Sequence, residues 1–167
     1  PKVAGRRLKM YIRPVVIDDE IQIDALVEDI ARFHDDAIKI KGYAGSAAER
    51  DKRQLQEKQH LKTVLDNVFH PLFGTPLENR FKDAFAQLAH CMVIIAKDHI
   101  FLDGNKRTAV KCMSIWYSYG VKLDIDDPPD PEKNLIYKWI EGIVKKERTE
   151  TELADYLRQH QAPAGTE

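Results

Sequence analysis

The chain has 167 residues, of which 43% are hydrophobic and 32% are charged, enough apolar material for one folded domain and too much for a disordered segment. The 26 Lys and Arg residues almost balance the 27 Asp and Glu residues, leaving a formal net charge of -1, which weighs against a dedicated nucleic-acid-binding protein. The longest apolar run, Cys91–Ala96, is too short to span a membrane, no apolar signal core follows the basic N-terminus, and two cysteines make neither a disulfide framework nor a zinc module. We therefore expect a cytoplasmic domain without membrane or direct nucleic-acid binding.

Residues 1–17 are predicted to form an N-terminal arm. Apolar and polar residues alternate here as far as Pro14, as in a short strand or an ordered extended arm. The apolar members of this alternation are Leu8, Met10 and Ile12. From Asp18 the apolar residues recur at three- and four-residue steps, which predicts a helix that ends near Gly42.

A second helix is predicted from Ser46 to about Phe69, and its charged middle section, Glu49–His60, indicates a face that lies in solvent. A further start signal stands at Thr75–Glu78, where an N-cap threonine is followed by proline and, three residues after the cap, by glutamate. The helix expected from this signal carries the most apolar face of the chain up to about Asp98. We expect it to be the central helix of the core.

Three more helices are predicted towards the C-terminus. The first begins at Asn105 and ends before Gly120, a residue type common just after a helix. The second opens after Asp130, and the third opens at Thr149, where Glu152 completes a capping box.

No internal repeat and no linker divides the chain. The sequence therefore predicts an all-α, single-domain helical bundle of about six helices over residues 18–160, followed by a frayed tail at 161–167.

The segment His99–Ala109, between two predicted helices, carries the most specific chemistry. Gly104 permits a positive φ or a close backbone approach, and Asn105 is expected to cap the next helix. The unpaired N–H groups at a helix start suit phosphate. Lys106 and Arg107 add two cations at the end of a helix where a purely structural role favours acidic residues. This conflict with a purely structural role predicts a phosphate-binding loop.

Two residues of this segment suit phosphate chemistry. Asp103 is a candidate ligand for a Mg²⁺ ion that bridges phosphate oxygens. His99 titrates near neutrality and is a candidate base for an incoming hydroxyl. Each residue alone also has an ordinary structural interpretation, as a cap, a turn or a solvated charge. Their occurrence within one short segment favours a site, and Phe101 is expected to be buried and to attach the loop to the bundle.

The pattern His99-x-Phe101-x-Asp103-Gly104-Asn105, followed by basic residues, resembles the loop motif of the Fic/Doc (Fido) family. The run from Asn105 to Ala109 is similar to the Doc (death-on-curing) toxin branch in particular. Weaker similarity covers Phe33–Asp35, Phe81–Asp98 and Glu152–Arg158. Two positions depart from the AMP-transferring Fic enzymes and agree with Doc: Lys106 stands in place of a glycine, and Val110 stands in place of an arginine that binds terminal phosphates.

The resemblance implies a toxin of a toxin–antitoxin system that uses ATP and Mg²⁺. It transfers the γ-phosphate to a Ser/Thr hydroxyl of a translation factor, elongation factor Tu in the family. AMP transfer by a Fic-type enzyme is the alternative reaction.

The residue roles implied by the resemblance follow the loop motif. His99, Asp103 and Arg107 are catalytic, with His99 as the base and Asp103 as the metal ligand. The nucleotide phosphates are bound by Gly104, Asn105, Lys106 and Arg107.

The resemblance also bears on partners. The inhibitory pattern Ser/Thr-x-x-x-Glu-Gly/Asn of many Fic proteins does not occur in the sequence, so a separate antitoxin that folds on binding is implied. The loop at about Phe69–Asn79 is where the family would place its target-docking flap.

Two other classes of protein stay open. One is a catalytically inactive interaction module with the same fold, against which the intact motif residues weigh. The other is a nucleic-acid-binding helical protein that uses Lys106, Arg107 and Lys111, against which the balanced net charge weighs.

Overall fold

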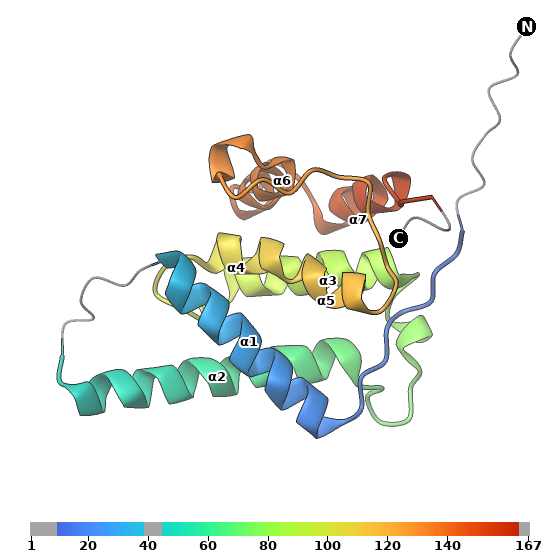
Figure 1. Ribbon diagram of the computed structural model, residues 1–167. Coiled ribbons are helices and arrows are strands. Elements are labelled where there is room, and N and C mark those ends of the chain that lie inside the picture. Colours follow the sequence, from blue (N-terminus) through green and yellow to red (C-terminus); the bar gives the residue numbers. More distant parts are fainter. Residues whose placement is uncertain (1–9, 39–44, 164–167) are drawn as a thin grey trace, which may run out of the picture.

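The computed structural model describes residues 10–38 and 45–163, and every regular element among them is helical (Figure 1). The α-helices are α1 (Glu20–Ile38), α2 (Ala47–Phe69), α3 (Ala84–Lys97), α4 (Asn105–Lys111), α5 (Met113–Ser118), α6 (Leu135–Val144) and α7 (Glu150–Gln159). Two short 3₁₀ helices precede α3 and α6: η1 (Leu77–Asn79) and η2 (Pro131–Lys133). Because α5 continues α4 after one residue, the all-α bundle of about six helices predicted from the sequence is confirmed.

The central helix is α3, which packs against α2, α4, α6 and α7. Ten of its 14 residues are buried. Its side chains with no exposed surface include Phe85, Leu88, Met92 and Ile95. Burial of an apolar side chain of this size contributes about 1.5–3 kcal/mol to the stability of the fold. The most apolar face of the sequence therefore lies in the core, as predicted.

The start of α3 differs from the sequence prediction. The signal at Thr75–Glu78 produces only η1, and α3 begins at Ala84, seven residues after the start of η1. Asp83 is the N-cap, and its carboxylate accepts a hydrogen bond from the backbone N–H of Ala86 at 2.9 Å. The N–H of Ala84 donates to the carbonyl of Ile12 at 2.8 Å. Contacts from distant parts of the chain therefore decide where α3 begins.

Residues 10–19 run as an extended arm without forming a strand. Gln87 of α3, which is fully buried, holds this arm. Its Oε1 accepts from the N–H of Val15 at 2.7 Å and from Trp116 Nε1 at 3.2 Å, and its Nε2 donates to the carbonyls of Val15 and Val68 at 2.8 and 2.9 Å. One amide thus joins the arm, α2, α3 and α5. Residues 1–9 lie outside the described part of the chain.

The ends of two further elements bear on the predictions. The described part of α1 ends at Ile38, and its predicted end near Gly42 lies outside the described residues. At the C-terminus, Gln161 bridges to Leu123 and the N–H of Ala162 donates to the carbonyl of Lys122 at 2.9 Å. These contacts hold the start of the predicted tail, and residues 164–167 lie outside the described part.

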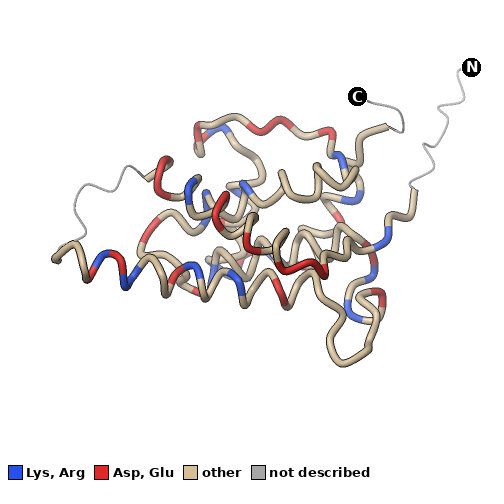
Figure 2. Tube along the Cα trace, turned by 60° about the horizontal axis from the view of Figure 1, so that its bottom comes forward, with Lys and Arg blue, Asp and Glu red and all other residues tan. Residues whose placement is uncertain are grey.

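Acidic and basic residues alternate along α2 (Figure 2). Its N-terminus has the capping box of Ser46 and Glu49, and Lys58 and Lys62 pair with Glu28 and Asp24 of α1 at 3.0 and 2.9 Å. The charged section is mostly exposed, as predicted. In residues 10–38 and 45–163, no helix combines the length and the apolar composition that a membrane span requires.

Candidate functional site

The loop between α3 and α4 begins with an unusual backbone conformation. Asp98 caps the C-terminus of α3, and His99 follows with φ of 51°, in the left-handed region. For a residue other than glycine, this backbone conformation costs about 1–2 kcal/mol of conformational free energy. Such local strain is found at functional sites more than elsewhere. The turn leaves His99 exposed at the edge of a cavity.

Phe101 and Asn105 hold the middle of the loop. The Phe101 side chain is buried in the core, as predicted. The side-chain amide of Asn105 donates to the Phe101 carbonyl at 2.8 Å and accepts from the Phe101 N–H at 3.0 Å. The sequence predicted Asn105 as the cap of the next helix, but Asn105 is the first residue of α4. Its side chain binds the backbone of the loop at Phe101.

The cap position of α4 is Gly104, which has φ of 77°. A Cβ atom at this position would lie 1.7 Å from Cδ1 of Ile38 on α1. Only glycine meets both requirements, a positive φ and a close approach of α1, as the sequence predicted.

Lys106 and Arg107, in the first turn of α4, are only loosely paired. Lys106 Nζ lies 3.9 Å from Glu141 Oε2 and 5.7 Å from the centre of the Tyr137 ring. Arg107 is exposed, and its Nη1 donates a long hydrogen bond, 3.4 Å, to the carbonyl of Ala37. Both side chains therefore keep donors for an anionic ligand.

One cavity of about 390 Å³ brings together all of the residues predicted to form the site. They are His99, Asp103, Gly104, Asn105, Lys106 and Arg107. The cavity is lined by an imidazole ring, a carboxylate and two cations. Phosphate transfer uses such groups as a general base, a metal ligand and the charges that neutralise phosphate.

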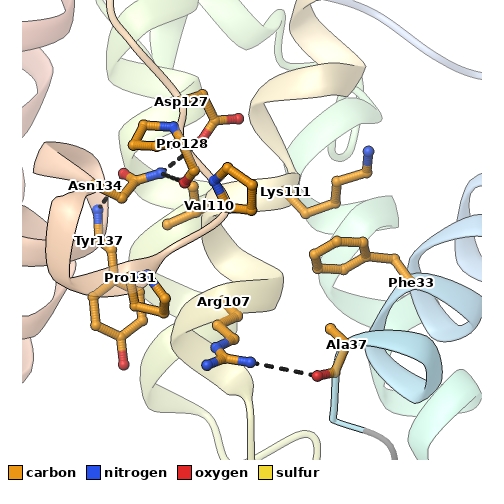
Figure 3. Close-up of a pocket in the computed structure, with 11 residues that line it drawn as sticks. Phe33, Ala37, Arg107, Val110, Lys111, Asp127, Pro128, Pro131, Asn134 and Tyr137 are labelled. Carbon is orange, nitrogen blue, oxygen red and sulfur yellow. Dashed lines mark hydrogen bonds between the residues drawn. The ribbon is translucent and has the colours of Figure 1, made fainter.

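A second cavity of about 420 Å³ adjoins the first and shares Ala37, Arg107 and Tyr137 with it. Figure 3 shows its walls, which come from α1, α4, η2, α6 and the segment before η2. Its lining includes the largely apolar residues Phe33, Val110, Pro128 and Pro131. The sequence analysis missed this cavity, because its walls come from separate segments and the prolines near position 130 were its only local signal.

The wall of the second cavity is fixed by Asn134, whose side chain is buried. Its Nδ2 donates to Asp127 Oδ1 at 2.6 Å and to the carbonyl of Pro128 at 3.1 Å, while its Oδ1 accepts from the N–H of Tyr137 (Figure 3). The turn between residues 127 and 134 is therefore held rigidly against α6.

Asp103 is suited to Mg²⁺. Its side chain lies at the cavity, and its Oδ1 accepts from the N–H of Gly104 at 2.7 Å. Within the described residues, no group of three or more His, Cys, Asp and Glu side chains could hold a metal ion. Mg²⁺ does not need such a group, because it commonly binds one or two carboxylates together with substrate phosphates and water.

The loop predicted to be the target-docking flap lies far from the candidate site. Phe69–Asn79 precedes α3, whereas the loop of the candidate site follows it, and the two lie at opposite ends of the bundle (Figure 1). The 14 residues of α3 separate them by about 20 Å at 1.5 Å per residue. Phe69–Asn79 therefore does not line the cavity of the candidate site, and its role in docking a target stays a prediction.

Comparison with known proteins agrees with the loop geometry. The model of the Fic/DOC family matches residues 22–117, from the first turn of α1 almost to the end of α5. No curated protein and no solved structure matches the chain.

Proposed function

Because the chain belongs to the Fic/DOC family, whose members are typically transferases that use nucleoside triphosphates, we propose that it is a Doc-type protein kinase. It transfers the γ-phosphate of ATP to a Ser/Thr hydroxyl of a translation factor.

The observation that carries this proposal is the pair of adjoining cavities. The polar cavity at the loop suits phosphates, and the apolar cavity suits a nucleoside, whose base can pack on Phe33, Tyr137 and the prolines. Arg107 lies between them and faces both. With the nucleoside in the apolar cavity, the phosphates run past Arg107 and the terminal phosphate lies beside His99.

Val110 supports this direction of binding. It is buried and lines the apolar cavity with aliphatic surface. The AMP-transferring relatives that the sequence resembles place an arginine here for the terminal phosphates. Arg107 and Lys111 are the cations that line this cavity, and the aliphatic side chain of Val110 keeps an apolar surface for the nucleoside that a third cation would remove.

In the proposed reaction, the target hydroxyl oxygen attacks the γ-phosphorus of ATP. His99 accepts the hydroxyl proton, the bond from the γ-phosphorus to the β,γ-bridging oxygen breaks, and ADP leaves. Lys106 and Arg107 neutralise the negative charge on the phosphates. Asp103 would hold Mg²⁺, which supplies further charge neutralisation when bound. The exposure of His99 allows the hydroxyl of a whole protein to reach it.

The biological setting follows from the resemblance to Doc. The target is elongation factor Tu, the protein is a cytoplasmic toxin, and a separate antitoxin binds it. AMP transfer is the competing reaction, since the loop cavity would accept an α-phosphate if ATP bound in the opposite direction.

The test is intact mass spectrometry of purified elongation factor Tu after incubation with the protein, ATP and Mg²⁺. A mass gain of one phosphate is expected, and it should be absent with the His99→Ala variant. A gain of one AMP would replace the kinase assignment with AMP transfer. No gain, either on this factor or on any protein of a translation extract, would contradict the transferase assignment.

A further inference from the structure

His34 of α1 lies directly beneath the loop of the candidate site. Its side chain is buried, with 1% of its surface exposed. The ring stacks on Phe101, with centroids 3.7 Å apart and planes 12° apart. Its Nε2 lies 2.8 Å from the backbone carbonyl oxygen of Asp103. Because a carbonyl oxygen only accepts hydrogen bonds, Nε2 carries the hydrogen and donates it.

This contact joins residues 69 positions apart in the sequence. A buried imidazole costs free energy unless its polar atoms are paired, so an apolar residue would fill the same space more simply. The second nitrogen, Nδ1, lies 3.1 Å from the exposed carboxylate of Asp35. The polar contact inside the protein is thus the one made with the loop.

Two neighbours of His34 on the same face of α1 also hold the loop. Residues three and four positions further along a helix share its face. At these positions, the carbonyl of Ala37 accepts from Arg107, and Ile38 packs against Gly104. The C-terminal part of α1 therefore contacts the loop at Asp103 and Gly104 and the first turn of α4 at Arg107.

We propose that His34 is a positioning residue for the phosphate-transfer loop. By donating to the Asp103 carbonyl and stacking on Phe101, it fixes the turn from which the side chains of His99 and Asp103 reach the cavity. The role in transfer rests on the proposed function, whereas the effect on loop order can be measured without any transfer.

Two substitutions separate the donor from the ring. His34→Phe keeps an aromatic ring that stacks on Phe101 and removes the Nε2 donor. His34→Gln removes the ring and keeps a side-chain N–H at about the same reach. Arg32→Gln is the matched control on α1, because Arg32 is exposed and, among residues 10–38 and 45–163, forms its ion pair with the exposed Asp29.

The kinetic expectation is a loss in kcat with little change in KM. A misplacement of about 1 Å at reacting groups costs up to roughly 100-fold in rate, so His34→Phe should lower the kcat of transfer by about 10- to 100-fold. The KM for ATP should change less than kcat, because Arg107 and the second cavity, which are proposed to bind the nucleotide, lie outside the loop. His34→Gln should recover most of the rate, and Arg32→Gln should match the wild type. Equal rates for wild type and a folded His34→Phe protein would overturn the proposal.

The structural expectation concerns the loop alone. Amide hydrogen exchange in residues 99–106 should be faster in His34→Phe than in the wild type, while exchange in α3 stays the same. If the wild type transfers neither phosphate nor AMP, the proposed function fails and this measurement still decides the role of His34. Unchanged exchange in the loop would show that His34 is only a core residue.

One measurement needs no variant and covers the case in which His34→Phe does not fold. Long-range ¹H–¹⁵N spectra of the wild type should show hydrogen on His34 Nε2. An Nε2 without hydrogen cannot donate to the Asp103 carbonyl and would contradict the proposal.

Discussion

His99 differs from an ordinary exposed histidine in its backbone as well as in its surroundings. Its φ of 51° places it in the left-handed region directly after α3, and the left-handed residue that follows many helices is usually glycine. Glycine here would relieve the strain and remove the imidazole. The structure thus keeps a histidine with a strained backbone at the edge of the cavity that is also lined by Asp103, Lys106 and Arg107.

Replacing His99 tests its role as the base. His99→Ala should lower transfer by about 10²–10⁴-fold, the usual effect of losing a positioned general base. Stability should change little, because the side chain is exposed and alanine meets the same backbone strain. Rates measured beside Lys97→Ala, an exposed neighbour that does not line the cavity, provide the control. Transfer by His99→Ala at the wild-type rate would remove His99 from the mechanism.

Asp103 carries a second prediction at this scale. Asp103→Asn should weaken the binding of ATP in the presence of Mg²⁺ by about tenfold or more, since a metal-ligating carboxylate supplies much of the affinity. Without Mg²⁺, the variant should bind ATP at least as well as the wild type. Calorimetric titrations with and without Mg²⁺ check this; a wild type that binds ATP equally well in both conditions would contradict the metal role.

At the scale of the elements, the turn that joins α3 to α4 requires a glycine at position 104. Gly104 and Gly74 both have positive φ, at 77° and 73°. A Cβ at Gly74 would meet nothing within 4 Å, whereas one at Gly104 would strike Ile38. The two positions therefore separate the cost of the backbone conformation from the cost of the clash with α1.

Gly74→Ala should lower the free energy of unfolding by about 1–2 kcal/mol, the cost of the left-handed conformation. Gly104→Ala should lower it further, and adding Ile38→Ala should recover part of the difference. Urea denaturation of the four proteins measures this. Equal losses in the free energy of unfolding for Gly74→Ala and Gly104→Ala would mean that Ile38 of α1 does not restrict the side chain at position 104.

The helix ends show what the sequence could and could not predict. The helix start at Ser46 and the capping box at Thr149 were predicted correctly, because a cap and its partner lie within one turn. The equally strong signal at Thr75 failed, because Asp83 offers a later cap that is stabilised by Arg158 of α7. The loop motif could be predicted because its residues are continuous in the sequence. The apolar cavity and the contact of His34 with the loop could not, because they form between distant segments.

At the scale of the whole molecule, Arg158 and Asp83 join the end of the chain to the start of the central helix. Nη2 of Arg158 donates to Asp83 Oδ1 at 3.0 Å, and its Nε donates to Oδ2. Burial raises the pKa of Asp83, but the hydrogen bonds from Arg158 and from the N–H of Ala86 outweigh burial, and the pKa is lowered from its usual value. Ionised Asp83 therefore stabilises the fold.

This lowered pKa gives a pH dependence with a definite sign. The contribution of Asp83 is fully present above the unfolded-state pKa of about 4 and is lost as the pH falls through the lower folded-state value. Asp83→Asn should lower the free energy of unfolding by about 3 kcal/mol near neutral pH, because it removes the buried carboxylate that pairs with Arg158. The difference from the wild type should narrow below about pH 4.

The matched control is Asp155→Asn, since Asp155 is the exposed second partner of Arg158. It should cost less than about 1 kcal/mol. Denaturation curves at several pH values check both variants, and a difference for Asp83→Asn that widens on acidification would show that the sign is wrong.

The direction in which ATP binds decides the function of the whole protein, and labelled ATP measures it directly. Elongation factor Tu is incubated in parallel with ATP labelled on the α- or the γ-phosphate, together with the wild type or the double variant Lys106→Gly/Val110→Arg. The wild type should deposit only the γ-label. The double variant should lose most of that activity, because it lacks Lys106 at the phosphates and adds a third cation to Arg107 and Lys111 in the second cavity. Deposition of the α-label by the wild type would contradict the kinase assignment and establish AMP transfer in its place.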